Sequence, residues 1–221
     1  MGVKEKFRIV TRIENLPDLT GLEAERQSDL VEDPTFIAIK ERVRKEAITV
    51  LAQGDQALID SAQIAYSHSF ERYVIPEEIV ARLGLAYGLR HPQARMQIQP
   101  PGLMTSMHLD DLSIGYVYPY EPSLPRLPFS QRDKEAFDKD PTVAVRFLIP
   151  IDPYRPGQGI LFEDQLVANW QPGDSIFWDW QHTPHATFNT SYWKRRLIRL
   201  TGLRTLKTKE ILAGQHPVVF Y

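Results

Sequence analysis

The 221-residue sequence contains no cysteine. Disulfides, iron–sulfur clusters, thiolate zinc sites and a cysteine nucleophile are all excluded, because each of them needs a thiol. Histidine, aspartate and glutamate therefore remain as the strong metal ligands. An excess of charge of one sign is also lacking: the formal net charge is -2, so no overall field favours a nucleic-acid partner or an acidic membrane surface.

Long hydrophobic runs are missing as well. The longest are far shorter than the roughly 20 residues of a transmembrane helix, and the start, MGVKEKFRIV, has no apolar region of the signal-peptide kind. We therefore expect a cytoplasmic protein with no membrane partner. Hydrophobic residues still make up 43% of the sequence, enough for a core, and the length suits a single domain over residues 1–221.

The first part of the domain, residues 1–92, has a mainly helical pattern. Asp33 and Pro34 suit a helix start, because a capping side chain is followed by proline at the first helical position. Apolar residues then recur at helical spacing until Gly54. Helices are expected at about residues 33–53, 56–70 and 76–88, and a strand within the first dozen residues.

From residue 93 to about 205 the pattern changes to short strands. Apolar and polar residues alternate over residues 94–99, and Gly/Pro turns at residues 156–159 and 171–174 separate later runs. Strands at this spacing indicate a β barrel or sandwich with helices packed outside. The further strands are expected at residues 112–118, 143–149, 159–162, 175–180, 186–188 and 197–201.

Two remaining segments complete the expected organisation. Residues 206–221 form a C-terminal extension of the β core. Residues 119–141 are rich in proline and charge and have no clear periodicity. A loop of that length in a compact domain is often a lid or a binding loop, so we expect this role here.

His108 and Asp110 are the first candidates for chemistry. Residues two apart on a strand point to the same face, so this imidazole and this carboxylate can converge on one ion. Asp111 would point to the opposite face. A second histidine must come from elsewhere in the fold, and His182 and His185 both follow the strand expected at 175–180.

Two histidines and one carboxylate on one side of an ion leave the opposite positions open, as in non-haem Fe(II) oxygenases. The same ligands also suit Mn(II), Co(II) or Zn(II). A lone His-x-Asp is common by chance and is often only a surface hydrogen-bonded pair. Its position after a strand and a turn, the later histidine and the basic strand that follows make the metal interpretation stronger.

That basic strand is Lys194–Thr201, which carries Arg195, Arg196 and Arg199. Arginine binds a carboxylate through two parallel hydrogen bonds and does so better than lysine. A solvated basic edge strand is the alternative explanation. Beside the histidines and the aspartate, we expect at least one of these arginines to point inward.

In this order the motifs resemble the Fe(II)/2-oxoglutarate-dependent dioxygenases, in particular the aspartyl/asparaginyl and prolyl hydroxylases. The resemblance covers about residues 94–203 and is carried by His108-Leu109-Asp110, by His185-Ala186-Thr187-Phe188-Asn189 and by the arginines that follow. It implies a double-stranded β-helix (jelly-roll, cupin-like) core with a helical N-terminal part. It also implies Fe(2+) held by His108, Asp110 and His185, with 2-oxoglutarate and O2 as cosubstrates.

The resemblance implies roles for further residues. The spacing to the following arginines favours His185 over His182 as the ligand. An Arg-Leu-Ile pattern favours Arg196 for the distal carboxylate of 2-oxoglutarate, with Arg195 and Arg199 as alternatives. The aspartyl hydroxylase group often has a histidine on a middle strand for the cosubstrate, and residues 143–149 have none.

The expected activity is hydroxylation of a C–H bond in an amino acid, a peptide or protein side chain, or another small molecule. Candidate substrate-binding residues are Arg146, Gln97, Gln99, His182 and Trp180, although ordinary strand alternation and core packing explain most of them equally well. Two alternatives remain open. One is a cupin-type metalloenzyme that does not use 2-oxoglutarate, and the other is a non-catalytic β-barrel binding module.

Overall fold

The computed structural model describes residues 7–10, 19, 22, 25–26, 71–105, 107–110, 130–163 and 165–213. Most of the regular structure in these residues is β-strand. The strands are β1 (Phe7–Val10), β2 (Glu25–Arg26), β3 (Glu71–Val74), β4 (Leu89–Gln99), β5 (Leu103–Met104), β6 (Ala144–Pro150), β7 (Gln158–Phe162), β8 (Gln165–Val167), β9 (Ser175–Trp178), β10 (His185–Asn189) and β11 (Arg195–Arg204). The helices are α3 (Glu77–Tyr87), α4 (Gln131–Lys139), the 3-10 turn Pro141–Val143 and α5 (Leu206–Ala213).

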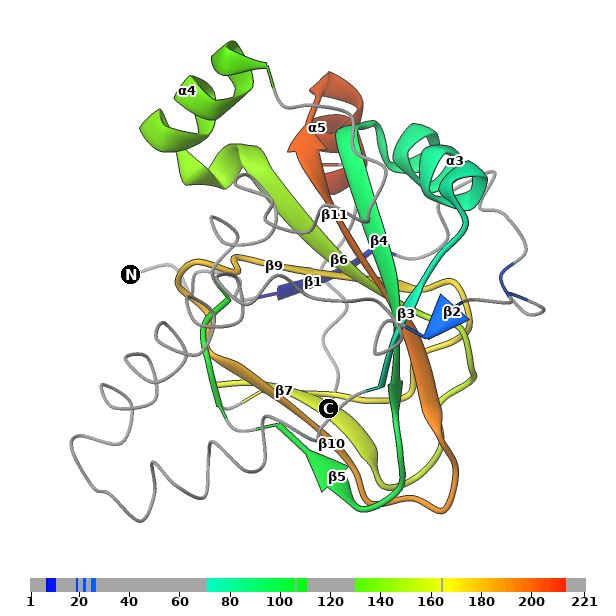
Figure 1. Cartoon of the computed structure of the whole chain (residues 1–221). Helices are drawn as coiled ribbons and strands as arrows, with labels where there is room; N and C mark the ends of the chain where they lie inside the picture. The colour runs from blue at the N-terminus through cyan, green and yellow to red at the C-terminus, as the bar shows by residue number, and fades with distance from the viewer. Residues whose placement is uncertain are drawn as a thin grey trace, which may run out of the picture.

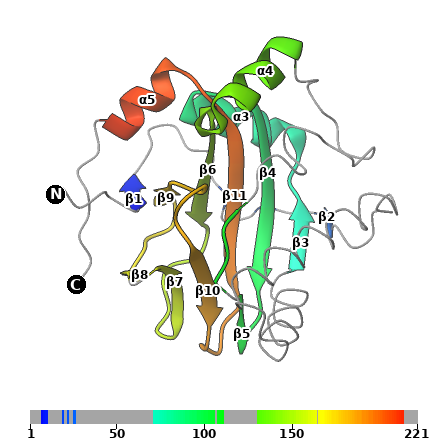
Figure 2. The ribbon, with the colours of Figure 1, turned by 90° about the vertical axis from the view of Figure 1, so that its left-hand side faces the viewer.

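The strands form two antiparallel sheets, which lie face to face (Figure 1). The larger sheet has the order β1-β9-β6-β11-β4-β3-β2, and the smaller has the order β5-β10-β7-β8. The long strands β4, β6 and β11 form the middle of the larger sheet, and α3, α4 and α5 gather at one end of them, as both views of the ribbon show (Figures 1 and 2). The core is therefore a jelly-roll, cupin-like β-helix, the fold that the family resemblance implies.

Strand alternation sorts the side chains of the larger sheet onto two faces. Leu148 and Leu197 point inward and pack with Ile160 and Phe162 of the smaller sheet. Residues of the opposite parity, such as Ile198, pack on the outer face among side chains that include those of α3. Both faces of the central strands are thus buried, and each fully buried side chain of this size contributes about 1.5–3 kcal/mol. The inner face is the one that carries the candidate site.

The described N-terminal residues contribute strands as well as helix. The helix expected from residue 76 to Gly88 is α3, which ends at Gly88 in the left-handed conformation (φ 65°). However, β1 forms one edge of the larger sheet and β3 pairs with β4 near the other. The boundary expected at residue 93 is also too late, because β4 already begins at Leu89. The helices expected at 33–53 and 56–70 lie outside the described residues.

The segment 119–141 differs from the expected irregular loop. Residues 131–139 form α4, which begins at the N-cap Ser130. The remainder of this segment up to residue 129, and the strand expected at 112–118, lie outside the described residues. Within the described part of the chain, we find no helix of the length and apolar character that a bilayer crossing requires.

Candidate metal centre and anion site

His108 and His185 lie opposite each other in the smaller sheet. His108 follows β5, and His185 is the first residue of β10. Their backbones form an antiparallel bridge, with His108 N donating to His185 O at 3.0 Å and His185 N donating to His108 O at 2.9 Å. This pairing brings the two imidazole rings to a centroid distance of 4.4 Å. A local backbone pairing therefore joins two residues that are far apart in the sequence.

Asp110 completes a set of three possible metal ligands. One ligand atom from each of His108, Asp110 and His185 lies within 4.8 Å of the others. Asp110 Oδ2 is 3.7 Å from His185 Nε2, and this oxygen is buried without a hydrogen-bond partner in the described structure. Buried polar atoms nearly always have a partner, so an orphaned carboxylate oxygen facing two imidazoles suits a bound cation. The donor set therefore fits a divalent metal of the non-haem iron type.

Electrostatics keep two of these ligands in their metal-binding protonation states. Burial lowers the pKa of His185 to about 4, against a smaller raising effect of Asp110, so its imidazole is neutral at pH 7. Burial would raise the pKa of Asp110, but the positive charge of Arg146, followed by His185 and His108, holds that pKa well below its ordinary range. A neutral imidazole and an ionised carboxylate are the forms that metals bind.

Aromatic side chains hold the ring of His185 in place. The ring of Trp178 meets it edge-on at 5.0 Å, and the ring of Phe162 stacks on it at 5.9 Å. These residues belong to the inner hydrophobic core. The imidazole therefore has a dry and rigid wall on one side.

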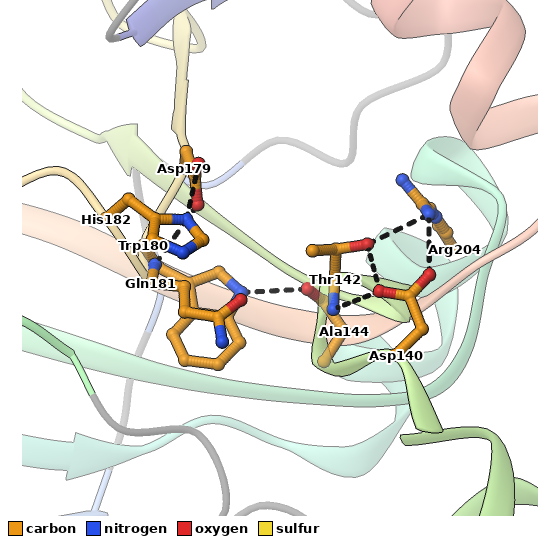
Figure 3. A network of polar contacts seen from close by, with 8 residues as sticks. All are labelled: Asp140, Thr142, Ala144, Asp179, Trp180, Gln181, His182 and Arg204. Atoms are coloured by element: carbon orange, nitrogen blue, oxygen red, sulfur yellow. Dashed lines mark hydrogen bonds and ion pairs between the residues drawn. The ribbon is translucent and has the colours of Figure 1, made fainter. Parts of the chain in front are cut away.

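His182 lies apart from this set. Its Nδ1 is 3.0 Å from Asp179 Oδ2, a contact drawn in Figure 3, and both side chains are exposed. Trp180, the other candidate in this loop, is buried, and its indole Nε1 donates to the carbonyl oxygen of Ala144 at 2.9 Å. Figure 3 shows this indole pointing to the start of β6. Trp180 therefore joins the loop between β9 and β10 to β6, whereas His182 makes its ion pair within that loop.

The neighbouring arginines of β11 point to opposite faces. Arg195 is 1% exposed, and its Nη1 donates to the carbonyl oxygen of Gly159 on the facing sheet at 2.9 Å. Arg196 points the other way: Nη2 donates to Asp152 Oδ1 at 2.7 Å, and Nε to the same carboxylate. The structure thus reverses the preference for Arg196 as the arginine inside the barrel, because inner residues of β11 have odd numbers at this point.

Arg195 has unused hydrogen-bonding capacity. Its Nε and Nη2 are buried without a hydrogen-bond partner in the described structure. Burial lowers the pKa of Arg195 to about 9, so the guanidinium keeps its charge at pH 7. Its Cζ lies 5.9 Å from the ring centroid of Trp170, whose Nε1 is also buried without a partner. Two orphaned donors on a buried cation suit a carboxylate.

The other predicted substrate residues lie on the same inner face. Gln97 and Gln99 are buried on β4, and Gln99 Nε2 donates to Thr187 Oγ1 at 3.2 Å. Arg146 is buried on β6, but its guanidinium already binds Asp110 and Thr201. Alternation in the sequence had indicated this face for the two glutamines.

Two residues near the site were not anticipated. Trp170 lies beneath Arg195, and no pattern around it distinguishes it from a core tryptophan. Asp152 binds the guanidinium of Arg196 on the outer face of β11. Its only signal in the sequence is its place two residues after the end of β6.

The chain is similar to several solved structures at low sequence identity. No protein-family model and no curated protein matches the sequence. Among solved structures, the chain is similar to a sugar phosphate isomerase of the cupin superfamily from Silicibacter pomeroyi, with 11% identity over 64% of this chain and 62% of that one, and a TM-score of 0.34. The match therefore spans less than two thirds of that protein.

Two further structures have the same level of similarity. A predicted oxalate decarboxylase from Thermotoga maritima has 11% identity over 61% of this chain and 81% of its own, with a TM-score of 0.34. A cupin 2 conserved barrel domain protein from Salinispora arenicola has 6% identity over 66% and 85%, also with a TM-score of 0.34. Two of the three, those from Silicibacter pomeroyi and Salinispora arenicola, are described as cupin proteins.

Proposed function

We propose that this chain is a non-haem Fe(II) oxygenase that uses 2-oxoglutarate as its cosubstrate. One observation carries the proposal: the set of His108, Asp110 and the buried His185 lies in the same barrel interior as the guanidinium of Arg195, which has two orphaned donors. The metal ligands alone suit many chemistries. A separate buried cation is the additional element that a carboxylate-bearing cosubstrate requires.

His108, Asp110 and His185 would hold the iron. When bound, the iron would supply the activation of O2 and of the cosubstrate at the positions that these three ligands leave open. The protein's own part is to keep His185 neutral by burial and Asp110 ionised through Arg146. Trp178 and Phe162 exclude water from one side of the imidazole.

Arg195 would bind the distal carboxylate of 2-oxoglutarate. Its Nη1 is anchored on the carbonyl oxygen of Gly159, which fixes the orientation of the guanidinium plane and leaves Nε and Nη2 for the ligand. Those two nitrogens lie on the same edge of the guanidinium, which is the edge that a carboxylate binds through two parallel hydrogen bonds. The orphaned Nε1 of Trp170 is a further donor near this position.

The substrate would be an amino acid, a peptide or protein side chain, or another small molecule that is hydroxylated at a C–H bond. Gln97 and Gln99 offer amide groups on the inner face for its recognition, and Gln99 Oε1 is buried without a hydrogen-bond partner in the described structure. An amide oxygen accepts from an ammonium or an N–H group, which suits the amino-acyl class.

Binding of 2-oxoglutarate tests this role for Arg195. Calorimetric titration into the Mn(II)-loaded protein under anaerobic conditions should show that Arg195→Met weakens binding by about 2 kcal/mol or more, roughly 30-fold. Arg196→Met is the matched control, because it removes the adjacent guanidinium from the outer face and should leave the affinity unchanged. Loss of affinity in Arg196→Met alone would assign the role to the other arginine.

Turnover tests the reaction itself. Wild-type protein incubated with Fe(II), ascorbate and 2-oxoglutarate should form succinate even without substrate, although slowly. The Asp110→Ala variant should form none. If the wild type binds Mn(II) but neither binds 2-oxoglutarate nor forms succinate, the oxygenase proposal fails.

A cupin-type metalloenzyme that does not use 2-oxoglutarate is the second candidate. The similar structures support it, because they are described as an isomerase, a predicted decarboxylase and a cupin barrel, and none of these three as an oxygenase. Arg195 would then hold an anionic group of a different substrate. Binding of Mn(II) without binding of 2-oxoglutarate would favour this candidate, and absence of metal binding would favour a non-catalytic barrel module.

A further inference from the structure

Arg146 is a buried cation in the middle of an apolar strand. It lies on β6, which has the sequence AVRFLIP, and it is 7% exposed. Its Nε donates to Thr201 Oγ1 at 3.2 Å, and Thr201 is its direct cross-strand neighbour on β11. Its Nη1 lies 2.6 Å from Asp110 Oδ1. The guanidinium is therefore fixed on one side by the sheet and on the other side holds a candidate metal ligand.

This contact makes the two oxygens of Asp110 different from each other. Oδ1 is engaged by the guanidinium in a short, charge-assisted bond. Oδ2 faces His185 and has no hydrogen-bond partner in the described structure. Because Arg146 is anchored on Thr201, the carboxylate cannot rotate to present both oxygens to the histidines without breaking the ion pair.

We infer that Arg146 is a positioning residue of the metal centre, which leaves Oδ2 as the single oxygen that Asp110 offers to the ion. Its charge also balances that of Asp110 before an ion binds. The inference rests on the proposed function, since it assumes that His108, Asp110 and His185 hold a metal. It differs from the role in substrate binding that the sequence indicated for Arg146.

The number of open positions on the metal depends on this arrangement. Three protein ligand atoms leave three positions of an octahedral ion for water, cosubstrate and O2. A carboxylate that binds through both oxygens fills a fourth position. By holding Oδ1, Arg146 keeps that position available.

Water proton relaxation by Mn(II) tests this count directly. Mn(II) bound to the wild type should carry three waters, and Mn(II) bound to Arg146→Met should carry two, so the inner-sphere relaxivity should fall by about one third. The control is Arg196→Met, which removes an arginine of the neighbouring strand β11 whose guanidinium binds Asp152 on the outer face, and it should leave the relaxivity unchanged. Unchanged relaxivity in Arg146→Met would overturn the positioning role.

Thermal unfolding tests whether the positive charge of Arg146 balances the negative charge of Asp110. Arg146→Met should lower the Tm of the metal-free protein more than that of the Mn(II)-loaded protein, because the ion then replaces the missing positive charge. A variant that fails to fold without metal should fold when Mn(II) is added. If Arg146→Met lowers the Tm of the metal-free and the Mn(II)-loaded protein equally, or if Mn(II) does not restore folding, Arg146 contributes only to packing.

One variant separates a failure of this inference from a failure of the proposed function. If Asp110→Ala binds Mn(II) as tightly as the wild type, the metal centre itself is wrong, and the role of Arg146 falls with it. The other outcome refutes only the role of Arg146. In that case Asp110→Ala loses Mn(II), while Arg146→Met has the relaxivity of the wild type and lowers the Tm of the metal-free and the Mn(II)-loaded protein equally.

Discussion

The buried carboxylate of Asp133 and the partly buried carboxylate of Asp110 have similar neighbours but different hydrogen-bonding patterns. Asp133, in the first turn of α4, accepts from His91 Nε2 at 2.9 Å and from Ser130 Oγ at 2.7 Å on Oδ2, while Arg90 engages Oδ1 at 2.9 Å. Asp110 also lies beside histidine and arginine. However, only its Oδ1 is engaged, by Arg146, and Oδ2 is orphaned in the described structure.

The difference separates a structural carboxylate from one that can bind a ligand. A carboxylate whose two oxygens both have partners joins the elements that supply those partners, here β4 and the start of α4. A carboxylate oxygen that is buried without a hydrogen-bond partner lowers the stability of the folded protein. Where such a group is nevertheless present, it usually serves a function. The predictions that follow test this contrast, beginning with the largest expected effect.

Metal binding should depend on one carboxylate and not on the other. Loss of groups that merely support a ligand costs about 10–100-fold in metal affinity, so Asp110→Ala should weaken Mn(II) binding by more than about 100-fold. Asp133→Ala should leave the affinity within about twofold. Calorimetric titration of both variants measures this, and an equal loss of affinity in both would refute the contrast.

Stability should depend strongly on Asp133 and in a pH-dependent way. Burial would raise its pKa, but hydrogen bonds from Ser130 and His91 and the charge of Arg90 bring the net value below the ordinary 3.8. Because the folded pKa is the lower one, this stabilisation is complete well above pH 3.8 and is lost as the pH falls through the folded pKa. Asp133→Ala should cost about 1–3 kcal/mol of unfolding free energy at pH 7.

Urea unfolding at pH 7 and at successively lower pH values measures that effect. The difference between the wild type and Asp133→Ala should shrink once the pH falls below 3.8. A constant difference over this range would mean that the ionised form of Asp133 has no special role.

Ser130 should make a smaller contribution to the same cluster. It is the N-cap of α4: its Oγ accepts from the backbone N of Asp133 at 3.1 Å and donates to Oδ2 of that residue. Removal of a capping hydroxyl costs about 1 kcal/mol, so Ser130→Ala should cost about that much in urea unfolding. A cost larger than that of Asp133→Ala would show that the cap, and not the carboxylate, fastens α4.

The smallest effect is expected at the exposed pair of His182 and Asp179. An exposed ion pair contributes little, so His182→Ala should change the unfolding free energy by no more than about 0.5 kcal/mol. Its Mn(II) affinity should equal that of the wild type. Weaker Mn(II) binding in this variant would return His182 to the list of possible ligands.

Local pattern predicted much of the barrel and which residues converge in the candidate metal centre. Alternation along residues 94–99 correctly assigned Gln97 and Gln99 to one face and Met96 to the other. The two-residue spacing of His108 and Asp110 agrees with their convergence in the structure. These features depend on neighbours in the sequence, which a strand or a short turn converts directly into geometry.

Side-chain directions and burial that depend on residues far away in the sequence could not be predicted from local pattern. Arg195 and Arg196 are followed by Leu197 and Ile198, which are equally apolar, so the sequence does not tell which parity faces the barrel interior. The helix α4 was missed because its buried face consists of Asp133 and Phe137, and a charged residue hides the apolar period. The burial of Asp133 depends on Arg90 and His91, which are remote in sequence.

Gly159 makes close contacts on both faces of the smaller sheet. Its carbonyl oxygen anchors Arg195 on the inside, whereas on the outside the ring of Phe188 occupies the space that a Cβ would need. The barrel wall is therefore one residue thick at the point where the guanidinium is fixed. A fluorine label on the ring of Phe188 would lie on the solvent side of that wall and should report, through its NMR shift, when an anion engages Arg195 on the other side.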